Sequence, residues 1–393
     1  MMRKPVYLDY HATTPVDTRV FEAMKPYFLE EFGNPGSRTH EYGDIAERAV
    51  ESARNEIANA INANLTSEIV FVSGATEANN ISIQGIACKL LRTGKDHIIT
   101  SVIEHKSVLS VVDALGKRGF HISYVNPNSD GVTEPSEIEK IINPQTGLIS
   151  IMHANNEIGV INDIKQIGEI ATKHGVIFHC DGAQSFGKIP IDVQKMNIHV
   201  LSIAAHKIYG PKGIGALYIR KKFPKVEIEP LFYGGGQERG IRPGTLATPL
   251  IVGLAEASKI ARNEMIDEMK RQKALRDYLF NRLQARCSDV VLNGSLENRL
   301  PNNLNVSFLG VDAESLMMNL RGEVAVSNGS TCTSATWDTS YVLKAMGIDA
   351  DRARSAVRFS LGRFTTKEEI DYVIEQIASA IIKLRNVIFA GVT

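Results

Sequence analysis

The sequence lacks any imbalance of charge. Its 393 residues include 44 Lys and Arg against 44 Asp and Glu, so the formal net charge at pH 7 is zero. A chain with this balance has no overall electrostatic attraction to nucleic acid or to an anionic membrane surface. We therefore expect no direct binding to nucleic acid and no membrane association driven by charge.

Long hydrophobic runs are also missing. No apolar stretch approaches the roughly 20 residues that a membrane-spanning helix needs. The N-terminal sequence MMRKPVYLDYHATTP turns polar and contains proline where a secretory signal would have its apolar segment. Neither a membrane protein nor a secreted protein is therefore expected.

Cysteine is scarce and unpaired in the sequence. Cys88, Cys180, Cys287 and Cys332 lie far apart, without a C-x-x-C pair. Isolated thiols of this kind are typical of a reducing compartment and argue against a structural metal site, so we expect a cytoplasmic protein with no metal. Cys88 and Cys180 occur in apolar runs and are expected in the core, whereas Cys287 is expected to be partly exposed.

Between residues 66 and 220, short strand-like runs alternate with helical patterns. The runs are EIVFV (68–72), HIITS (97–101), HISYV (121–125), GLISIM (147–152), VIFHC (176–180), VLSIA (200–204) and GALYI (215–219). This rhythm predicts an α/β fold with a mostly parallel seven-stranded sheet covered by helices.

A long helical pattern from 246 to about 284 then leads to mixed strands and helices, typical of a smaller α+β domain. We expect a large domain over residues 16–258. Residues 1–15 and 259–393 would form the small domain, which would carry the segment around Cys332.

Two strand ends carry side chains that suit a pyridoxal 5'-phosphate (PLP) enzyme. Lys207 follows the strand at 200–204, and a lysine amine there can form a Schiff base. Asp181 follows the strand at 176–180, and a carboxylate can keep the pyridine nitrogen of PLP protonated. Because ligands of open α/β sheets bind outside the carboxyl ends of strands, both side chains are expected in one site. Taken alone, Lys207 would more often be a surface residue and Asp181 a helix cap.

Two further segments suit the same cofactor. SGATEANN (73–80) follows a strand and opens a helix, whose N-terminal amides favour a phosphate dianion. His105 also follows a strand, where an imidazole can stack on a flat ring. By itself the first segment would be a plain turn, and His105 a packed or capping residue. In combination with Lys207 and Asp181 they favour PLP.

Longer motifs resemble the PLP-dependent cysteine desulfurases of the NifS/IscS type, which have fold type I and belong to the class V aminotransferase group. The matching segments are YLDYHATTPVD, FGNPGSRTH, VFVSGATEANN, EHKSV, HANNEIGV, HCDGAQS, HKIYGPKGIGALYIR, GGGQERGIRPGT, NNLNVSF, SNGSTCTSATW and VRFSLGRFT. The resemblance implies that L-cysteine is converted to L-alanine and that its sulfur forms a persulfide on Cys332. It also implies a homodimer and a sulfur-acceptor protein, either an iron–sulfur scaffold or another sulfur carrier.

The resemblance assigns a role to each site residue. Lys207 would hold PLP covalently and carry the substrate Cα proton, while His105 would stack on the ring and assist proton transfer. Asp181 would pair with the ring nitrogen and Gln184 with the ring hydroxyl. The phosphate would be held by Ala75, Thr76, His206 and, from the other subunit, Thr245; the substrate carboxylate would be held by Asn34, Asn156 and Arg358.

The chain departs from the family pattern in two places. Ala204 stands where the family commonly has a phosphate-binding serine, two residues before His206. Because a hydrogen bond to a charged group contributes about 1.5–3 kcal/mol, weaker PLP binding is expected unless another donor compensates. The chain also ends at FAGVT, short of the tail with which many bacterial members dock the iron–sulfur scaffold. His11 and Pro243 are milder variations to which the sequence assigns no role.

Several alternatives stay open at this point. A selenocysteine lyase would use the same residues, whereas an aminotransferase would need no cysteine in the segment of Cys332. A non-catalytic binding protein that kept the fold is favoured only by Ala204. The sulfur acceptor is open as well, because iron–sulfur assembly, tRNA thiolation, thiamine synthesis and DNA phosphorothioation all use such donors.

Overall fold

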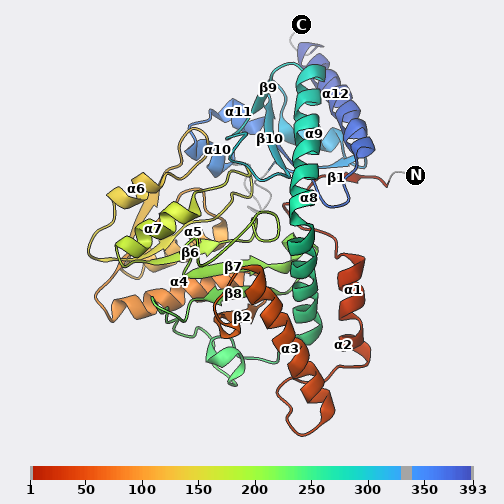
Figure 1. Cartoon of the computed structure of the whole chain (residues 1–393). Helices are drawn as coiled ribbons and strands as arrows, with labels where there is room; N and C mark the ends of the chain where they lie inside the picture. The colour runs from red at the N-terminus through yellow and green to blue at the C-terminus, as the bar shows by residue number, and fades with distance from the viewer. Residues whose placement is uncertain (1–2, 329–338, 391–393) are drawn as a thin grey trace.

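A computed structural model describes residues 3–328 and 339–390, shown in Figure 1. Its main element is a seven-stranded sheet in the order β2-β8-β7-β6-β5-β3-β4. β8 runs antiparallel to both of its neighbours, and every other pair is parallel. The prediction of a mostly parallel seven-stranded sheet is confirmed. Its strands are β2 (Ile69–Val72), β3 (His97–Ser101), β4 (His121–Val125), β5 (Thr146–Ser150), β6 (Ile177–Asp181), β7 (Val200–Ala204) and β8 (Gly215–Ile219).

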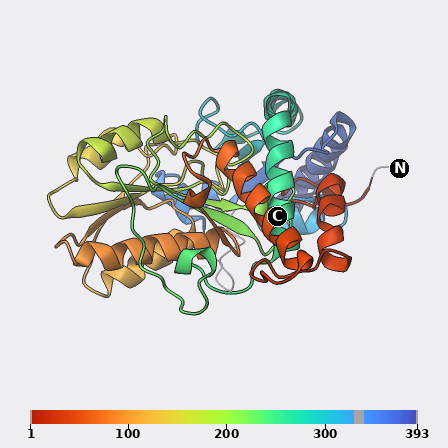
Figure 2. The same ribbon diagram turned by 60° about the horizontal axis from the view of Figure 1, so that its bottom comes forward.

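Helices cover both faces of this sheet. Figure 2 shows α4 (Ala75–Leu91) and α5 (Lys106–Gly116) on one side of the strands, and α6 (Pro135–Lys140) and α7 (Ile164–Lys173) on the other. The inner strands β3, β5, β7 and β8 are buried at every position, and β6 at every position except Ile177, as strands require when both faces of a sheet are covered. Short 3₁₀ helices also join the elements: η1 (Thr66–Glu68), η2 (Ala205–Lys207) and η3 (Gln237–Gly240).

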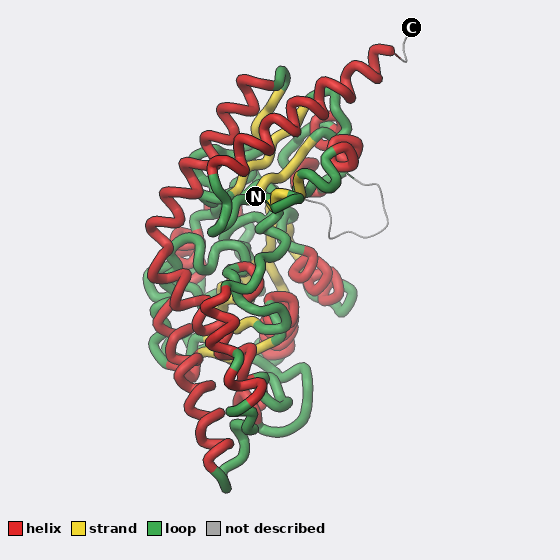
Figure 3. The backbone as a smooth tube through the Cα atoms, turned by 90° about the vertical axis from the view of Figure 1, so that its right-hand side faces the viewer, coloured by secondary structure: helices red, strands yellow, loops and turns green. Residues whose placement is uncertain are grey.

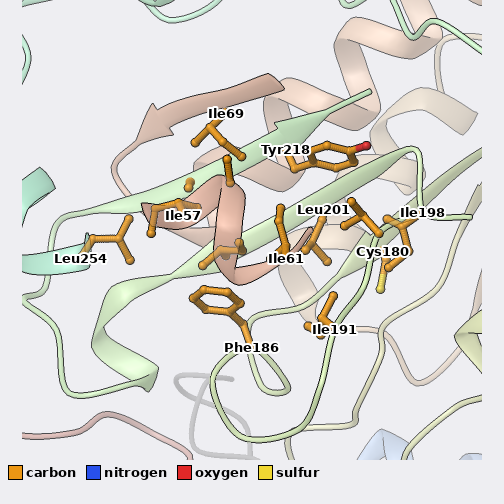
Figure 4. Packing of buried hydrophobic residues seen from close by; sticks show 14 of the residues in the cluster. Ile57, Ile61, Ile69, Cys180, Phe186, Ile191, Ile198, Leu201, Tyr218 and Leu254 are labelled. Atoms are coloured by element: carbon orange, nitrogen blue, oxygen red, sulfur yellow. The ribbon is translucent and has the colours of Figure 1, made fainter. Parts of the chain in front are cut away.

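The core on the α7 side is closed by α3 (Glu41–Ala60), which packs along α8 (Thr248–Arg286). Ile57 of α3 and the following Ile61 are fully buried against the sheet, beside Leu201 and Tyr218, as Figure 4 shows. Two short helices, α1 (Thr18–Met24) and α2 (Pro26–Leu29), precede α3. None of these three helices follows from the strand–helix rhythm, which begins only at residue 66.

The long helix α8 connects the two parts of the molecule, as Figure 3 shows. Its first turns, from Ile251 to Ile260, contribute to the core beneath the large sheet, whereas Leu279 and Leu283 belong to a second core. The second core contains the three-stranded sheet β12-β10-β9 and the parallel pair β1-β11. The boundary expected at residue 258 stays a prediction; along α8, the change from the first core to the second falls between Ile260 and Leu279. The remaining elements are β1 (Val6–Tyr7), β9 (Val290–Leu292), β10 (Asn303–Phe308), α9 (Ala313–Asn319), β11 (Val324–Ala325), α10 (Tyr341–Ala345), α11 (Ala350–Arg354), β12 (Ala356–Ser360) and α12 (Lys367–Ala390).

Two expectations for cysteines are wrong. Cys88 is exposed, because it lies on the outward face of α4, which is apolar on nearly all sides. Cys287 is buried, because it caps α8 against the second core. Cys180 lies in the core as expected.

No helix in the described ranges is both long and apolar enough to cross a bilayer. The same ranges contain no group of three or more His, Cys, Asp or Glu residues that could hold a metal ion.

Candidate active site

The predicted cofactor residues gather where the parallel strands of the large sheet end. Asp181 is the last residue of β6, Lys207 lies in η2 directly after β7, and His105 caps α5 just beyond β3. The charges of Asp181 and Lys207 both act on the pKa of His105, so the three side chains share one electrostatic environment. Because parallel strands present their carboxyl ends at one edge, the topology brings together residues far apart in sequence.

Asp181 is held from two sides. Its Oδ1 accepts a hydrogen bond from the backbone N of Ala183 at 2.9 Å, and its Oδ2 accepts one from Nδ2 of Asn79 at 2.8 Å. The same Nδ2 lies 2.8 Å from Oγ of Ser107, in the first turn of α5. Asp181 is 6% exposed and Asn79 is fully buried. Asn79 therefore ties the carboxylate to both helices that line the site.

The start of α4 provides a place for a phosphate. Its N-cap is Gly74, at φ +154°, and no side chain caps the helix, so the amides of the first turn remain available. A Cβ on Gly215 of β8 would lie 2.7 Å from the Cα of Gly74, so glycine at 215 lets the strand support this turn closely. Ala75 and Thr76 form the first turn, with Thr76 exposed.

His206 lies beside Lys207 in η2, and its Nδ1 is 3.1 Å from Oγ1 of Thr13. Burial and the charge of Lys207 lower the pKa of His206 to about 4. The neutral ring can donate one hydrogen bond, and a bound dianion would raise its pKa. Ala204, two residues earlier, is buried at the end of β7 and offers no hydroxyl.

Lys207 is anchored to the segment that follows β1. Its Nζ donates to the backbone O of His11 at 2.6 Å and to that of Ala12 at 2.8 Å. Nδ1 of His105 accepts from the backbone N of Ser107 at 3.1 Å, so the neutral ring carries its proton on Nε2. Burial lowers the pKa of His105, which favours this neutral form. His105 therefore caps α5, as the alternative interpretation expected, and it also lies in the site.

These residues fit PLP. A carboxylate, a lysine amine, a histidine and an uncapped helix N-terminus meet at one sheet edge, and each matches a different part of the cofactor: ring nitrogen, aldehyde, ring face and phosphate. The amide of Gln184 is 7% exposed and is held by the ring of His11, near Lys207. Ala204 leaves the phosphate cradle one hydroxyl short.

The small domain contributes a second group of polar residues. The guanidinium of Arg358, on β12, donates from Nη2 to Oδ1 of Asp9 at 2.6 Å and from Nη1 to the backbone O of Asn156 at 2.8 Å. Within the described part of the chain, its Nε and Oδ1 of Asn156 are buried without a hydrogen-bond partner. Unsatisfied buried polar atoms of this kind are rare and suit a site completed by a ligand.

Two predicted residues are exposed and form no hydrogen bond with this group in the described part of the chain. Asn34 is exposed in the loop after α2, and its Oδ1 accepts from the backbone N of Gly36. Thr245 is exposed in the loop before α8. No hydrogen bond in the described residues joins either to the site, so their roles stay predictions.

Cys332 lies outside the described residues, but both flanks of its segment are placed. Ser327 forms an antiparallel bridge with Arg358, with the backbone N of Arg358 2.6 Å from the O of Ser327. On the other flank, Oγ of Ser340 donates to Oε2 of Glu157 at 2.5 Å, next to Asn156. The segment therefore leaves and rejoins the described structure beside the site.

A model of the aminotransferase class-V family matches residues 6–373, and the chain belongs to this family. Its members are PLP-dependent enzymes, which agrees with the arrangement around Asp181 and Lys207.

Individual proteins similar to this chain indicate which members of the family it resembles. The chain is 50% identical over 385 residues to the cysteine desulfurase IscS of Anaeromyxobacter dehalogenans, covering 98% of this chain and 94% of the relative. Its structure is similar to that of a NifS-like protein, with a TM-score of 0.90, 39% identity and coverage of 97% of this chain and 100% of the other. It is also similar to SspA, solved in complex with cysteine, with a TM-score of 0.80, 39% identity and coverage of 92% and 100%.

The structure adds site residues to which the sequence gave no role. Asn79 and Asp9 hold Asp181 and Arg358 in place. Both occur in motifs that carry the family resemblance, SGATEANN and YLDYHATTP. For Asn79, the only hint in the sequence was a polar amide among the apolar residues of a predicted helix. For Asp9 the sequence held no hint, because its partner Arg358 is 349 residues away.

Proposed function

We propose that this chain is a PLP-dependent cysteine desulfurase that converts L-cysteine to L-alanine and receives the sulfur on Cys332. Bound PLP supplies an electron sink for the negative charge left on the substrate carbon. The carbon–sulfur bond of the substrate breaks, a sulfur–sulfur bond to Cys332 forms, and a proton replaces sulfur on the substrate carbon.

The protein's residues divide this work. Asp181, fixed by Asn79, would pair with the ring nitrogen of the cofactor. The amine of Lys207 would remove the proton from the substrate Cα. The neutral ring of His105, with its proton on Nε2, would support proton transfer on the open face.

One observation carries the proposal. Lys207 and Arg358 come from different sheets, yet both are hydrogen-bonded to the segment 9–12. This segment therefore links the guanidinium that would bind the substrate carboxylate to the amine that would act on Cα. An amino acid held by its carboxylate at Arg358 would present its Cα toward the amine.

The position of Cys332 is supported by its flank. It is five residues beyond Ser327, and five extended residues reach at most roughly 17 Å. Ser327 pairs with Arg358, so the chain tethers the Cα of Cys332 within that reach of a residue adjacent to the proposed carboxylate site.

The test measures L-alanine released from L-cysteine by the purified holoenzyme. Cys332→Ser should lower alanine formation at least about tenfold, because no thiolate is left to accept sulfur. The matched control is Cys88→Ser, at an exposed thiol on α4, which should keep the wild-type rate. Undiminished alanine formation by Cys332→Ser would refute the persulfide step. A parallel assay with L-selenocysteine shows whether the protein is instead a selenocysteine lyase, which would use selenocysteine and leave cysteine nearly untouched.

We further propose a homodimer in which Thr245 reaches the phosphate of the partner's site. Its exposed position before α8 leaves it available, and exposed apolar side chains on α2 and the loop that follows, Phe28, Leu29 and Phe32, give a surface to cover. A cytoplasmic location and delivery of sulfur to an iron–sulfur scaffold or another carrier are proposed as well. They are supported by the unpaired cysteines and by the similarity to IscS.

A further inference from the structure

The side chain of His11 is one part of the site that the proposed chemistry does not use. It lies four residues after the end of β1 and is 1% exposed. Its Nδ1 is 2.6 Å from Oε1 of Gln184, and its backbone O accepts from Nε2 of Gln184 at 3.0 Å. Nζ of Lys188 also donates to Oε1 of Gln184, at 3.1 Å. Both ends of the Gln184 amide are thus engaged.

These contacts fix which way the amide of Gln184 points. A backbone carbonyl can only accept, so the atom facing the O of His11 must be the amide nitrogen. The other end must then be the carbonyl oxygen, which Lys188 also requires because its Nζ carries hydrogens in either protonation state. His11 must therefore donate from Nδ1.

A neutral imidazole has one N–H, so His11 is held as the Nδ1–H tautomer. Its Nε2 is buried without a hydrogen-bond partner in the described residues. A second proton there would place an unpaired charge in the interior, and burial accordingly lowers the pKa of His11 well below its ordinary value.

The arrangement leaves the side chain of Gln184 with one further hydrogen bond to make. Its oxygen already accepts two hydrogen bonds, and one of its two amide hydrogens is used by the O of His11. The remaining hydrogen can only be donated. Gln184 therefore presents a donor, and its complement on the cofactor is a ring oxygen that accepts.

We propose that His11 is a positioning residue, which locks the Gln184 amide so that a single N–H is presented to the ring oxygen of PLP. This inference rests on the proposed contact between Gln184 and the ring hydroxyl. His11 is itself fixed by the small domain, because its backbone N donates to Oγ of Ser360 on β12 at 2.9 Å. The ring end of the cofactor is thereby linked to the same strand that carries Arg358.

Two substitutions separate positioning from packing. Asn and Leu are close in size and shape, but only Asn retains a donor near the position of Nδ1. The probes are PLP and its analogue 3-deoxypyridoxal 5'-phosphate, which lacks the ring oxygen. Equilibrium binding of each probe is measured by titrating the full-length apoprotein and following the absorbance of the bound cofactor.

His11→Leu should weaken PLP binding about tenfold, which is the loss expected for one well-placed hydrogen bond, and should weaken the deoxy analogue less than about twofold. His11→Asn should stay within about threefold of wild type for both probes. Equal weakening of both probes by His11→Leu, or no weakening of PLP, would overturn the proposal.

If His11→Leu does not fold, His11→Ala replaces it, and the contrast with His11→Asn is read in the same way. The outcome is distinct from that of the proposed function. If the wild-type protein binds PLP but makes no alanine from cysteine, the proposed desulfurase activity is refuted. If the protein is a desulfurase but the His11 variants bind both probes with equally changed affinity, only the positioning role is refuted.

Discussion

The two sides of the active site are built in different ways. On the cofactor side, Asp181 is the last residue of a strand, and Lys207 and His105 lie within four residues after two other strands of the same sheet. On the substrate side, Arg358 joins Asp9 across 349 residues of chain and pairs with Ser327 through a short bridge. The first side depends on strand ends, and the second depends on how the small domain packs against the large one.

This difference has a consequence for function. Strand ends in a buried parallel sheet are held by the whole ladder, so the groups that would bind PLP stand on rigid supports. The groups that would bind the substrate lie where three chain segments converge, and they contain the unsatisfied Nε of Arg358 and Oδ1 of Asn156. Substitutions on the first side should affect cofactor chemistry, and those on the second should affect substrate affinity.

The largest effect is expected for Lys207→Ala on the cofactor side. Loss of the amine removes both the covalent link to PLP and the base that would act on Cα, so alanine formation should fall about 10³-fold or more. The absorbance of the lysine-linked cofactor should disappear as well. Lys195→Ala, a surface lysine before β7, serves as the control and should keep the wild-type rate. Substantial turnover by Lys207→Ala would show that the strand-end lysine is not the reacting amine.

On the substrate side, Arg358→Lys keeps the positive charge but loses the planar fork. The KM for L-cysteine should rise about 10–100-fold, because one hydrogen bond to the carboxylate is lost. The absorbance of bound PLP should stay unchanged. Arg354→Lys, on the exposed face of α11, is the matched control. A changed cofactor spectrum with an unchanged KM would contradict the division between the two sides.

The cofactor side could be predicted from sequence because its information is local. The strand at 200–204 is found with exact bounds, and that at 176–180 is shifted by one residue, so Lys207 and Asp181 were placed at strand ends before any packing was known. The helix starting at Ala75 was expected from SGATEANN. Apolar runs of strand length, bounded by glycine or polar residues, carry this signal directly.

The substrate side was assigned only through resemblance, for a physical reason. The contacts of Arg358 with Asp9 and Asn156 depend on tertiary packing, which no periodicity encodes. Helix α3 was not predicted, because it precedes the first strand of the large sheet and so lies outside the alternating strand–helix pattern. Cys88 was misplaced because α4 is apolar around most of its surface, so the apolar run at 81–91 does not reveal its outward face.

Asn79→Ala tests whether Asp181 needs its support from α4. Removal of the amide leaves a carboxylate oxygen at the buried sheet edge without its donor, which should cost about 1–3 kcal/mol of unfolding free energy and weaken PLP binding. Asn80→Ala is the control, because its amide bonds only within α4, and a change within about 0.5 kcal/mol is expected. Equal effects of the two substitutions on unfolding by urea and on cofactor binding would show that Asn79 acts only as a helix residue.

The smallest effect expected is on the pH dependence of the unfolding free energy, through two buried histidines near the cofactor side of the sheet. Burial lowers the pKa of His153 and of His179 to about 4 each. An unfolded chain binds protons at these residues near pH 6.5. As the pH falls from 6.5 toward 4, the unfolded state therefore gains protons that the folded state does not bind, and stability decreases.

Each of these histidines should contribute about 1 kcal/mol of lost stability between pH 6 and 5, and this loss should level off as the pH falls through about 4. His153→Gln should reduce the slope of unfolding free energy against pH by close to one proton, and His153→Gln with His179→Gln by close to two. Urea unfolding at several pH values measures these slopes. Slopes that match wild type in both variants would mean that the two imidazoles are protonated within the folded protein. The sheet edge that carries Asp181 would then tolerate charge far better than its burial implies.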